Sequence, residues 1–182
     1  MRRFLWFLIP CSLLLGLACG TPAEEAPSGP PTPVPTPRDF AAIRDVDVAS
    51  LPDTASLLQR LGSGRVAGEG VLYADLTGDR RDEAIVPISA DGTLGNVAYL
   101  VYTLKSGRPV LVLTRTMDRT TASGLVMDLD EFGALTETVG VYAAEDAFCC
   151  PSQLRLTTFR WDGAALQVAG EQKVAQPTKA TQ

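Results

Sequence analysis

The segment "NVAYLVYTL", residues 96–104, carries apolar side chains at both its odd and its even positions. Successive side chains of a β-strand point to opposite faces of a sheet, so a half-exposed strand alternates in polarity and a fully buried strand does not. This segment therefore predicts a central strand that is covered on both sides.

Outward from this strand, the chain is rich in Val, Leu, Thr and Tyr, and short turn clusters interrupt it. These features predict further strands at "GVLYADL" (70–76), "EAIVPIS" (83–89), "PVLVLTRTM" (109–117), "GLVMDLD" (124–130), "LTETVGVYA" (135–143), "QLRLTTFRW" (153–161) and "AALQVAGEQKV" (164–174). Alternation is clear in the segment 135–143, where Glu137 falls on the same face as Leu135 and Val139.

The connections between these strands are short, for example at 105–108 and 131–133. Such turns cannot hold crossover helices, so the strands should run antiparallel as a meander. The pair Asp162-Gly163 suits a two-residue hairpin turn of type I′.

One short helix is predicted ahead of the strands, within "LPDTASLLQRLGSG", residues 51–64. Asp53 or Thr54 can cap its start, and Gly62 can end it. Its apolar face is formed by Leu57, Leu58 and Leu61.

The sequence thus predicts a mainly β fold, a curled antiparallel β-meander sheet or small barrel with one short N-terminal helix. This single globular domain should span residues 39–176, because no second change in composition divides that stretch. Residues 177–182 are predicted to be a disordered tail.

The start of the chain has the pattern of an export signal. Arg2 and Arg3 precede an uncharged apolar run over residues 4–18, and small residues lie just before Cys19. The apolar run is short for a permanent membrane helix, so residues 1–18 are predicted to be a cleaved signal peptide.

The end of this run, "LLGLACG" at 14–20, resembles the lipobox of bacterial prolipoproteins. The resemblance implies that Cys19 becomes the new N-terminus, bears a lipid such as palmitate and anchors the chain to a membrane, facing away from the cytoplasm. From the residues alone, an ordinary secretory signal with an incidental Cys is the alternative.

Residues 19–38 are rich in proline and poor in apolar side chains. Such a segment stays extended and cannot build a core, so we interpret it as a disordered tether between the lipidated Cys19 and the domain. A proline-rich ligand for a partner domain is the alternative interpretation.

Composition excludes several function classes. The formal net charge is −5, and an acidic chain without a basic patch is a poor nucleic-acid binder. The chain has no histidine, which eliminates Ser-His-Asp and Cys-His catalysis and His-containing zinc sites. We therefore expect a protein that is not an enzyme and needs no cofactor.

The acidic loop "DLTGDRRDE", residues 75–83, is a candidate calcium site. In a DxDxDG-type loop its ligands would be Asp75, Thr77, Asp79 and Glu83. Arg80 stands where such loops place a turn-forming Gly, and Thr77 offers only a neutral hydroxyl, so any calcium site should be weak. The favoured interpretation is a turn in which the Asp side chains accept backbone hydrogen bonds and an Arg pairs with Asp82.

Two adjacent cysteines, Cys149 and Cys150, are the ones left after lipidation of Cys19 and removal of Cys11. In an oxidising compartment they can form a vicinal disulfide, or stay as two packed thiols, or bond another chain. A vicinal bridge closes no loop, so it would stiffen a turn rather than stabilise the whole fold.

The combination of "DLTGD", "CCPS" and "WDG", over about residues 71–168, resembles uncharacterised bacterial secreted or lipoprotein domains. The acidic loop between two strands is itself similar to FG-GAP and VCBS β-repeat loops, whose family role is calcium binding and adhesion.

The sequence therefore favours a lipid-anchored, non-catalytic cell-envelope protein that binds or scaffolds an unknown envelope protein or ligand. A calcium-dependent adhesion module and a thiol-redox protein using Cys149 and Cys150 are the alternatives.

Overall fold

The computed structural model describes residues 39–90, 94–117, 122–147 and 150–176. They belong to one compact unit, Pro37–Gln182. The predicted signal peptide (1–18), tether (19–38) and tail (177–182) lie outside the described residues, as do Cys19 and Cys149.

The first half of the unit forms an antiparallel sheet around β3 (Glu83–Ser89) and β4 (Asn96–Lys105). Strand β5 (Arg108–Thr116) pairs with the far edge of β4. Two short strands, β1 (Arg65–Val66) and β2 (Leu72–Ala74), both pair with β3, one at each end of it.

The second half forms a four-stranded antiparallel meander, with neighbours in chain order. Its strands are β6 (Ala122–Leu129), β7 (Leu135–Val141), β8 (Gln153–Trp161) and β9 (Leu166–Ala175). Short turns join β6 to β7 and β8 to β9, and all three pairings between neighbouring strands are antiparallel.

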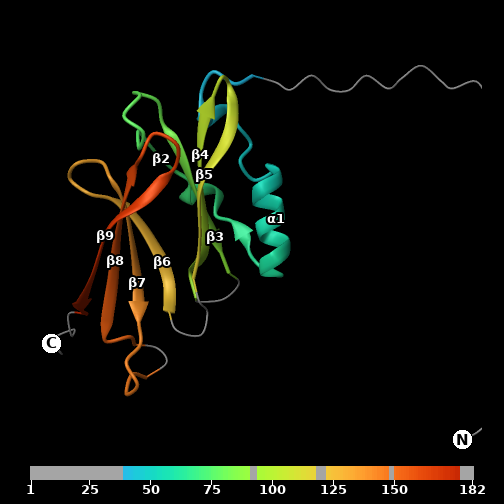
Figure 1. Cartoon of the computed structure of the whole chain (residues 1–182). Coiled ribbons are helices and arrows are strands. Elements are labelled where there is room, and N and C mark those ends of the chain that lie inside the picture. Colours follow the sequence, from blue (N-terminus) through green and yellow to red (C-terminus); the bar gives the residue numbers. More distant parts are fainter. Residues whose placement is uncertain (1–38, 91–93, 118–121, 148–149, 177–182) are drawn as a thin grey trace, which may run out of the picture. The chain divides into compact units, whose positions relative to one another are not determined.

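The two sheets lie next to each other (Figure 1), and an apolar cluster packs between them. The first sheet contributes Ile85, Tyr99, Val101 and Val112, and the second contributes Leu125, Leu135, Val139, Phe159 and Leu166. Polar contacts also cross the layers, and in one of them the Asn96 side-chain amide donates to the Leu125 carbonyl at 3.2 Å.

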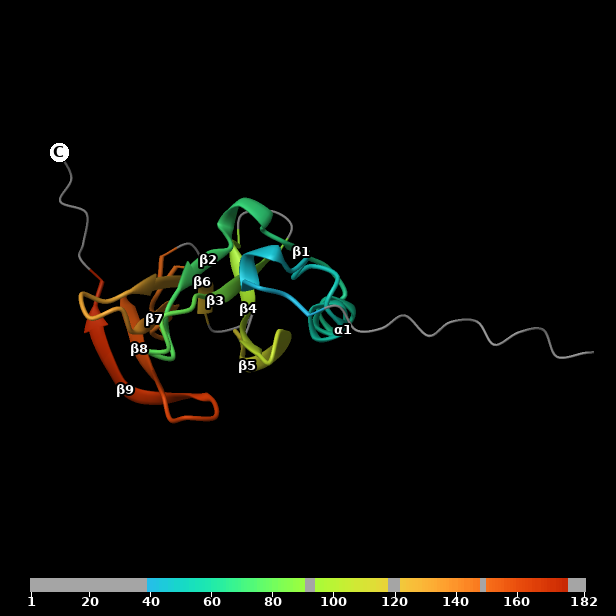
Figure 2. The same cartoon turned by 90° about the horizontal axis from the view of Figure 1, so that it is seen from above.

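The opposite face of the first sheet is covered by helix α1 (Pro52–Leu61) and the short 3₁₀ helix η1 (Ile43–Asp45). Figure 2 shows α1 and the second sheet on opposite sides of β3 and β4. Leu57 of α1 is buried in this cluster, and Leu58 and Leu61 pack at its margin, as their spacing predicts. A further short 3₁₀ helix, η2 (Gly68–Gly70), links β1 to β2.

Strand β4 confirms the prediction of a central strand that is covered on both sides. Tyr99 and Val101 face the second sheet, Leu100 and Tyr102 face the helix side, and all are at most 1 % exposed. The mainly β, antiparallel prediction with one short α-helix is confirmed. The described strands are divided between two open sheets, so the arrangement is a stack of layers and not a closed barrel.

Two local predictions need correction. The residue that caps α1 is Leu51, not Asp53 or Thr54, because Pro52 occupies the first helical position, where its fixed φ and missing N–H are tolerated. Gly62 does end the helix, in the left-handed conformation with φ +67°.

The β8–β9 hairpin turn is displaced by one residue from its predicted place. The Asp162 N–H donates to the Ala165 carbonyl, so the two central residues are Gly163 and Ala164. Gly163 has φ +100°, and the Asp162 carboxylate accepts from the backbone N–H groups of Ala164 and Ala165. These hydrogen bonds lower the pKa of Asp162.

Candidate functional site

The acidic loop connects β2 to β3 and is closed by its own carboxylates. Asp75 Oδ1 accepts from Gly78 N at 2.7 Å, and Asp75 Oδ2 accepts from Arg80 N at 2.8 Å. Asp79 Oδ1 accepts from Arg81 N at 2.9 Å. The predicted turn-stabilising role of the two Asp side chains therefore agrees with the geometry.

Two residues of the loop have positive φ. Gly78 lies at +79°, as expected for the residue type, and Arg80 lies at +67°. A non-glycine residue in this region costs about 1–2 kcal/mol. The loop thus takes the left-handed conformation at Arg80 despite its side chain, and the two hydrogen bonds to Asp75 help to hold it there.

Glu83 closes the loop from inside the protein. Its side chain is fully buried, Oε2 accepts from Leu76 N at 2.7 Å and Thr77 N at 3.1 Å, and Oε1 accepts from the Thr103 hydroxyl at 2.8 Å. Burial raises the pKa of Glu83, and these hydrogen bonds oppose the shift. Glu83, the first residue of β3, therefore links the acidic loop to Thr103 of the neighbouring strand β4.

The four predicted calcium ligands therefore lie in one loop but bond largely to the chain itself. The Thr77 hydroxyl is 3.5 Å from Glu83 Oε1, and the Asp and Glu carboxylates accept the contacts given above. In the described part of the chain, no group of three His, Cys, Asp or Glu side chains is arranged to hold a metal. Calcium binding stays a prediction.

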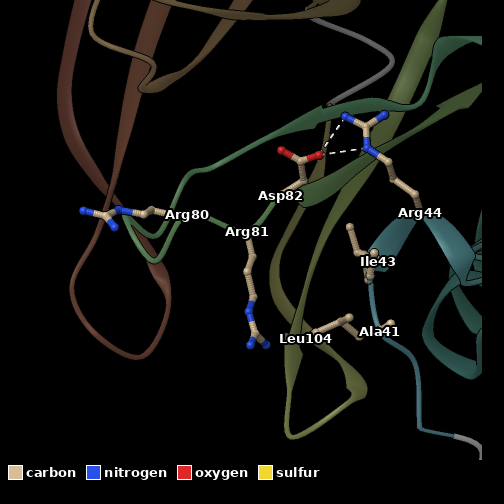
Figure 3. A pocket seen from close by; sticks show the side chains of 8 residues that line it. Ala41, Ile43, Arg44, Arg80, Arg81, Asp82 and Leu104 are labelled. Carbon is tan, nitrogen blue, oxygen red and sulfur yellow. Dashed lines mark hydrogen bonds and ion pairs between the residues drawn. The ribbon is translucent and has the colours of Figure 1, made fainter.

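The predicted partner of Asp82 was wrong. Asp82 pairs with Arg44, from η1, at 2.7 Å, and the Arg44 guanidinium also lies 4.3 Å from the centre of the Tyr73 ring. Figure 3 shows the Arg80 and Arg81 side chains pointing away from Asp82. The pair was missed because its members are 38 positions apart in sequence.

A cavity of about 330 Å³ lies beside this ion pair (Figure 3). Its lining combines the three arginines with Asp82 and the apolar side chains of Ala41, Ala42, Ile43 and Leu104. Arg44 is paired with Asp82, and the other two cations that line this cavity are the loop residues Arg80 and Arg81.

A second pocket lies where the acidic loop meets the turns of the second sheet, and we call it the loop pocket. Its volume is about 320 Å³. The acidic loop contributes residues 75–78, the β6–β7 turn and the first residue of β7 contribute 132–135, and the β8–β9 hairpin contributes Phe159, Arg160, Trp161 and Leu166. Asp75 and Thr77, singled out from sequence, thus line a pocket with aromatic and apolar walls.

The mouth of the loop pocket carries an unusually exposed aromatic side chain. Phe132, in the β6–β7 turn, is 81 % exposed. Nearby, Lys105 lies over the Trp161 ring, 5.5 Å from its centre. The turn itself is fixed by Asp130, whose Oδ1 accepts from Phe132 N at 2.9 Å and Ala134 N at 2.8 Å. A concave surface with aromatic walls and a few oriented polar groups is typical of a binding site.

Sequence reasoning recognised residues 131–133 only as a turn and so missed Phe132 as a site residue. The available signal was the position of a large apolar residue at the tip of a short turn, where it cannot reach a core. Its meeting with the acidic loop depends on the stacking of the two sheets, which the local pattern does not contain.

A buried ion pair joins the two sheets away from the pockets. Arg115 of β5 makes two hydrogen bonds to Glu137 of β7, at 2.8 and 2.9 Å, and Glu137 is 1 % exposed. These bonds raise the pKa of Arg115. Burial, with the negative charge of Glu137, raises the pKa of Tyr99, whose buried hydroxyl has no hydrogen-bond partner in the described structure.

Cys150 is disulfide-bonded. Cys149, its predicted vicinal partner, lies outside the described residues, so that pairing stays a prediction. Among the residues that the structure describes, no helix is long and apolar enough to cross a membrane. Comparisons of the chain with family models, curated proteins and solved structures find no match.

Proposed function

We propose that this chain is a lipid-anchored, non-catalytic protein of the bacterial cell envelope whose β domain binds a partner through the loop pocket. The single observation that carries the binding role is the juxtaposition of the acidic loop, exposed Phe132 and Trp161 around one concavity. The anchoring role rests on the sequence around Cys19.

The chemistry of the loop pocket favours binding over catalysis. Asp75 is occupied by backbone N–H groups, and the accessible aromatic walls are provided by Phe132 and Trp161, because Leu135, Phe159 and Leu166 are buried between the sheets. Such walls suit an apolar or aromatic group of an envelope partner, with the loop backbone and Arg160 giving orientation.

A photoreactive amino acid placed at position 132 in the full chain, in cells, tests the binding site. We expect a discrete cross-linked partner from position 132 and none from position 59, where Gln59 is exposed on the distant helix α1. Replacing Trp161 by Ala should weaken the cross-link at 132. Equal products from both positions, or none from 132, would contradict a binding role for this pocket.

The anchor is tested separately with Cys19→Ser. We expect to find the unaltered chain in the membrane fraction, and intact mass spectrometry should show that its N-terminus is acylated. The variant should be absent from the membrane fraction. A variant that stays in the membrane fraction and carries the same added acyl mass as the unaltered chain would contradict lipidation at Cys19.

A calcium-dependent binding module is the second candidate, because Asp75 and Thr77 lie both in the candidate calcium loop and on the loop pocket. A native-state ligand raises the melting temperature by mass action. This candidate predicts a higher melting temperature in millimolar calcium than in chelator, and loss of that difference in Asp79→Ala. Equal melting temperatures would exclude it.

A further inference from the structure

The last strand, β9, forms an open edge of the second sheet. Among the described residues it pairs only with β8, at the outside of the second sheet (Figure 1), and every residue from 167 to 175 is exposed. An open edge presents unpaired N–H and C=O groups that another strand can pair with.

The register with β8 identifies which backbone groups face outward. Gln176 N donates to Ser152 O at 2.8 Å, and this register continues as Leu154 opposite Val174 and Leu156 opposite Gln172. Hydrogen-bonded pairs alternate along an antiparallel ladder, so the even-numbered residues of β9 from 170 onward bond to β8. The backbone groups of Glu171 and Lys173 therefore point to the open edge.

Two of the residues whose backbone groups face outward, Glu171 and Lys173, carry opposite charges. If a second copy of β9 pairs antiparallel with the first about a two-fold axis at Gln172, Glu171 of each copy lies directly opposite Lys173 of the other. That register also makes each Glu171–Lys173 pair a hydrogen-bonded pair, which the outward backbone groups require. Opposite charges in directly facing positions stabilise strand pairing.

The side chains on the other face of β9 fit the same register. Gly170 of one copy lies opposite Val174 of the other, and the space beside Gly170 is open, with no atom within 4 Å of where a Cβ would be. A hollow of about 460 Å³ adjoins it, lined by Thr158, Gly170 and Gln172 among others. Val174 is 38 % exposed in the single chain, so pairing would cover an apolar side chain.

We propose that two copies of this chain associate through β9, joining their second sheets into one continuous antiparallel sheet about a two-fold axis at Gln172. This surface is separate from the loop pocket, so the proposal stands independently of the proposed partner. The edge carries charged side chains and a ladder irregularity near Val168, which are features that usually protect an edge. The stretch 170–176 beyond the irregularity is nevertheless regular and contains no proline, and its charges are paired in the proposed register.

Charge reversal tests the register, with the full chain in mild detergent studied by sedimentation velocity. Glu171→Lys alone and Lys173→Glu alone each place like charges opposite one another, and each should raise the dimer dissociation constant about tenfold or more. The double variant Glu171→Lys/Lys173→Glu should dimerise as the unaltered chain does.

Mixing the two single variants gives the sharpest outcome. In the proposed register, a mixed pair has Glu opposite Lys at both positions, so the two variants should form heterodimers more tightly than either forms homodimers. The proposal would be overturned if neither charge reversal changed the dimer dissociation constant. It would also be overturned if the unaltered chain stayed monomeric at about millimolar concentration.

A disulfide trap checks the two-fold axis by a different measurement. Gln172→Cys would face its own copy in a non-hydrogen-bonded pair, where the Cα atoms lie about 4.5 Å apart, within the range that a disulfide can bridge. The full chain carrying this change should give a covalent dimer on a non-reducing gel. Gly170→Cys, which would face Val174, should not, and equal trapping at both positions would overturn the register.

Discussion

Glu83 shows how one buried carboxylate can determine the shape of a surface loop. It accepts hydrogen bonds from Leu76 N, Thr77 N and the Thr103 hydroxyl, and it has no access to solvent. In the sequence it appeared as the last acid of a possible calcium loop. In the structure it is the residue that ties that loop to the core.

Removing this carboxylate should therefore be costly. Glu83→Ala leaves several donors unsatisfied in the interior, and we expect it to lower the free energy of unfolding by about 2–4 kcal/mol. Asp79→Ala is the matched control, because it removes one exposed acceptor, and it should cost less than about 1 kcal/mol. Urea denaturation of the unit 37–182 measures both, and equal losses would contradict the role given to Glu83.

Glu83 also predicts a dependence of stability on pH. Burial raises its pKa in the folded state above the ordinary value of 4.5, so the folded protein takes up this proton at higher pH than the unfolded chain. The contribution of Glu83 to stability is lowest above the folded pKa and increases as pH falls through it.

The unaltered chain should therefore gain stability relative to Glu83→Gln as the pH falls from neutrality towards the ordinary pKa of 4.5, as measured by urea denaturation. The lowered pKa values of Asp146 and Asp162 act below their ordinary value of 3.8, outside this window. A stability difference that stays constant across the window would contradict the raised pKa.

Arg80 offers a test of backbone strain. Arg80→Gly removes a side chain from a left-handed residue, whereas Arg81→Gly makes the same change where φ is not positive. Both variants gain the same freedom in the unfolded state, so Arg80→Gly should be more stable than Arg81→Gly by about 1–2 kcal/mol. Thermal or urea unfolding compares them, and an equal effect would show that Arg80 is unstrained.

At the scale of elements, the contact between β5 and β7 is the most sensitive polar connection. Arg115→Ala would leave Glu137 charged and unpaired between the sheets, and we expect a loss of about 3–5 kcal/mol. The exposed pair Arg108–Asp39 is the control, and Arg108→Ala should cost less than about 1 kcal/mol.

A double variant separates the pair's own contribution from the penalty of breaking it. Arg115→Met/Glu137→Leu removes both charges and should recover most of the stability lost in Arg115→Ala. Urea denaturation measures the free energy of unfolding of the single and double variants. A double variant as unstable as Arg115→Ala would mean that packing, not the orphaned charge, determines the loss.

Individual strands could be predicted from sequence because their signal is local. The segments "EAIVPIS" and "QLRLTTFRW" coincide with β3 and β8, since apolar runs and turn residues mark both ends of each. The start of α1 was wrong because Pro52 and the Asp and Thr after it give competing local signals. Alternation along β7 did place Glu137 on the apolar face, but nothing local identifies Arg115 as its partner.

At the scale of the whole molecule, the sequence predicted a mainly β domain but not the division into two sheets. That division depends on which faces dock, and docking is decided by residues distant in sequence, such as Tyr99 and Phe159. For the same reason, only part of the lining of the loop pocket was predicted from the sequence. Asp75 and Thr77 were identified in the acidic loop, whereas Phe132, in the β6–β7 turn, lines the same pocket from the second half of the chain.

The two layers should depend on each other for stability. A fragment of residues 122–176 would expose the inner face formed by Leu125, Leu135, Val139 and Phe159. We expect this fragment to lack fixed side-chain packing and to bind a hydrophobic dye, whereas the unit 37–182 should not. Well-dispersed amide resonances from the isolated fragment would contradict this expectation.

The order of the strands also has a kinetic consequence. Each sheet is built from consecutive strands of one half of the chain, so most pairings join neighbours in sequence, and closing such short loops is fast. Contacts between the halves, such as Asn96 with Leu125 and Arg115 with Glu137, bring together more distant residues and should form after the rate-limiting barrier. Substitutions there should accelerate unfolding and leave the folding rate nearly unchanged, so the interface between the layers determines how long the native state survives.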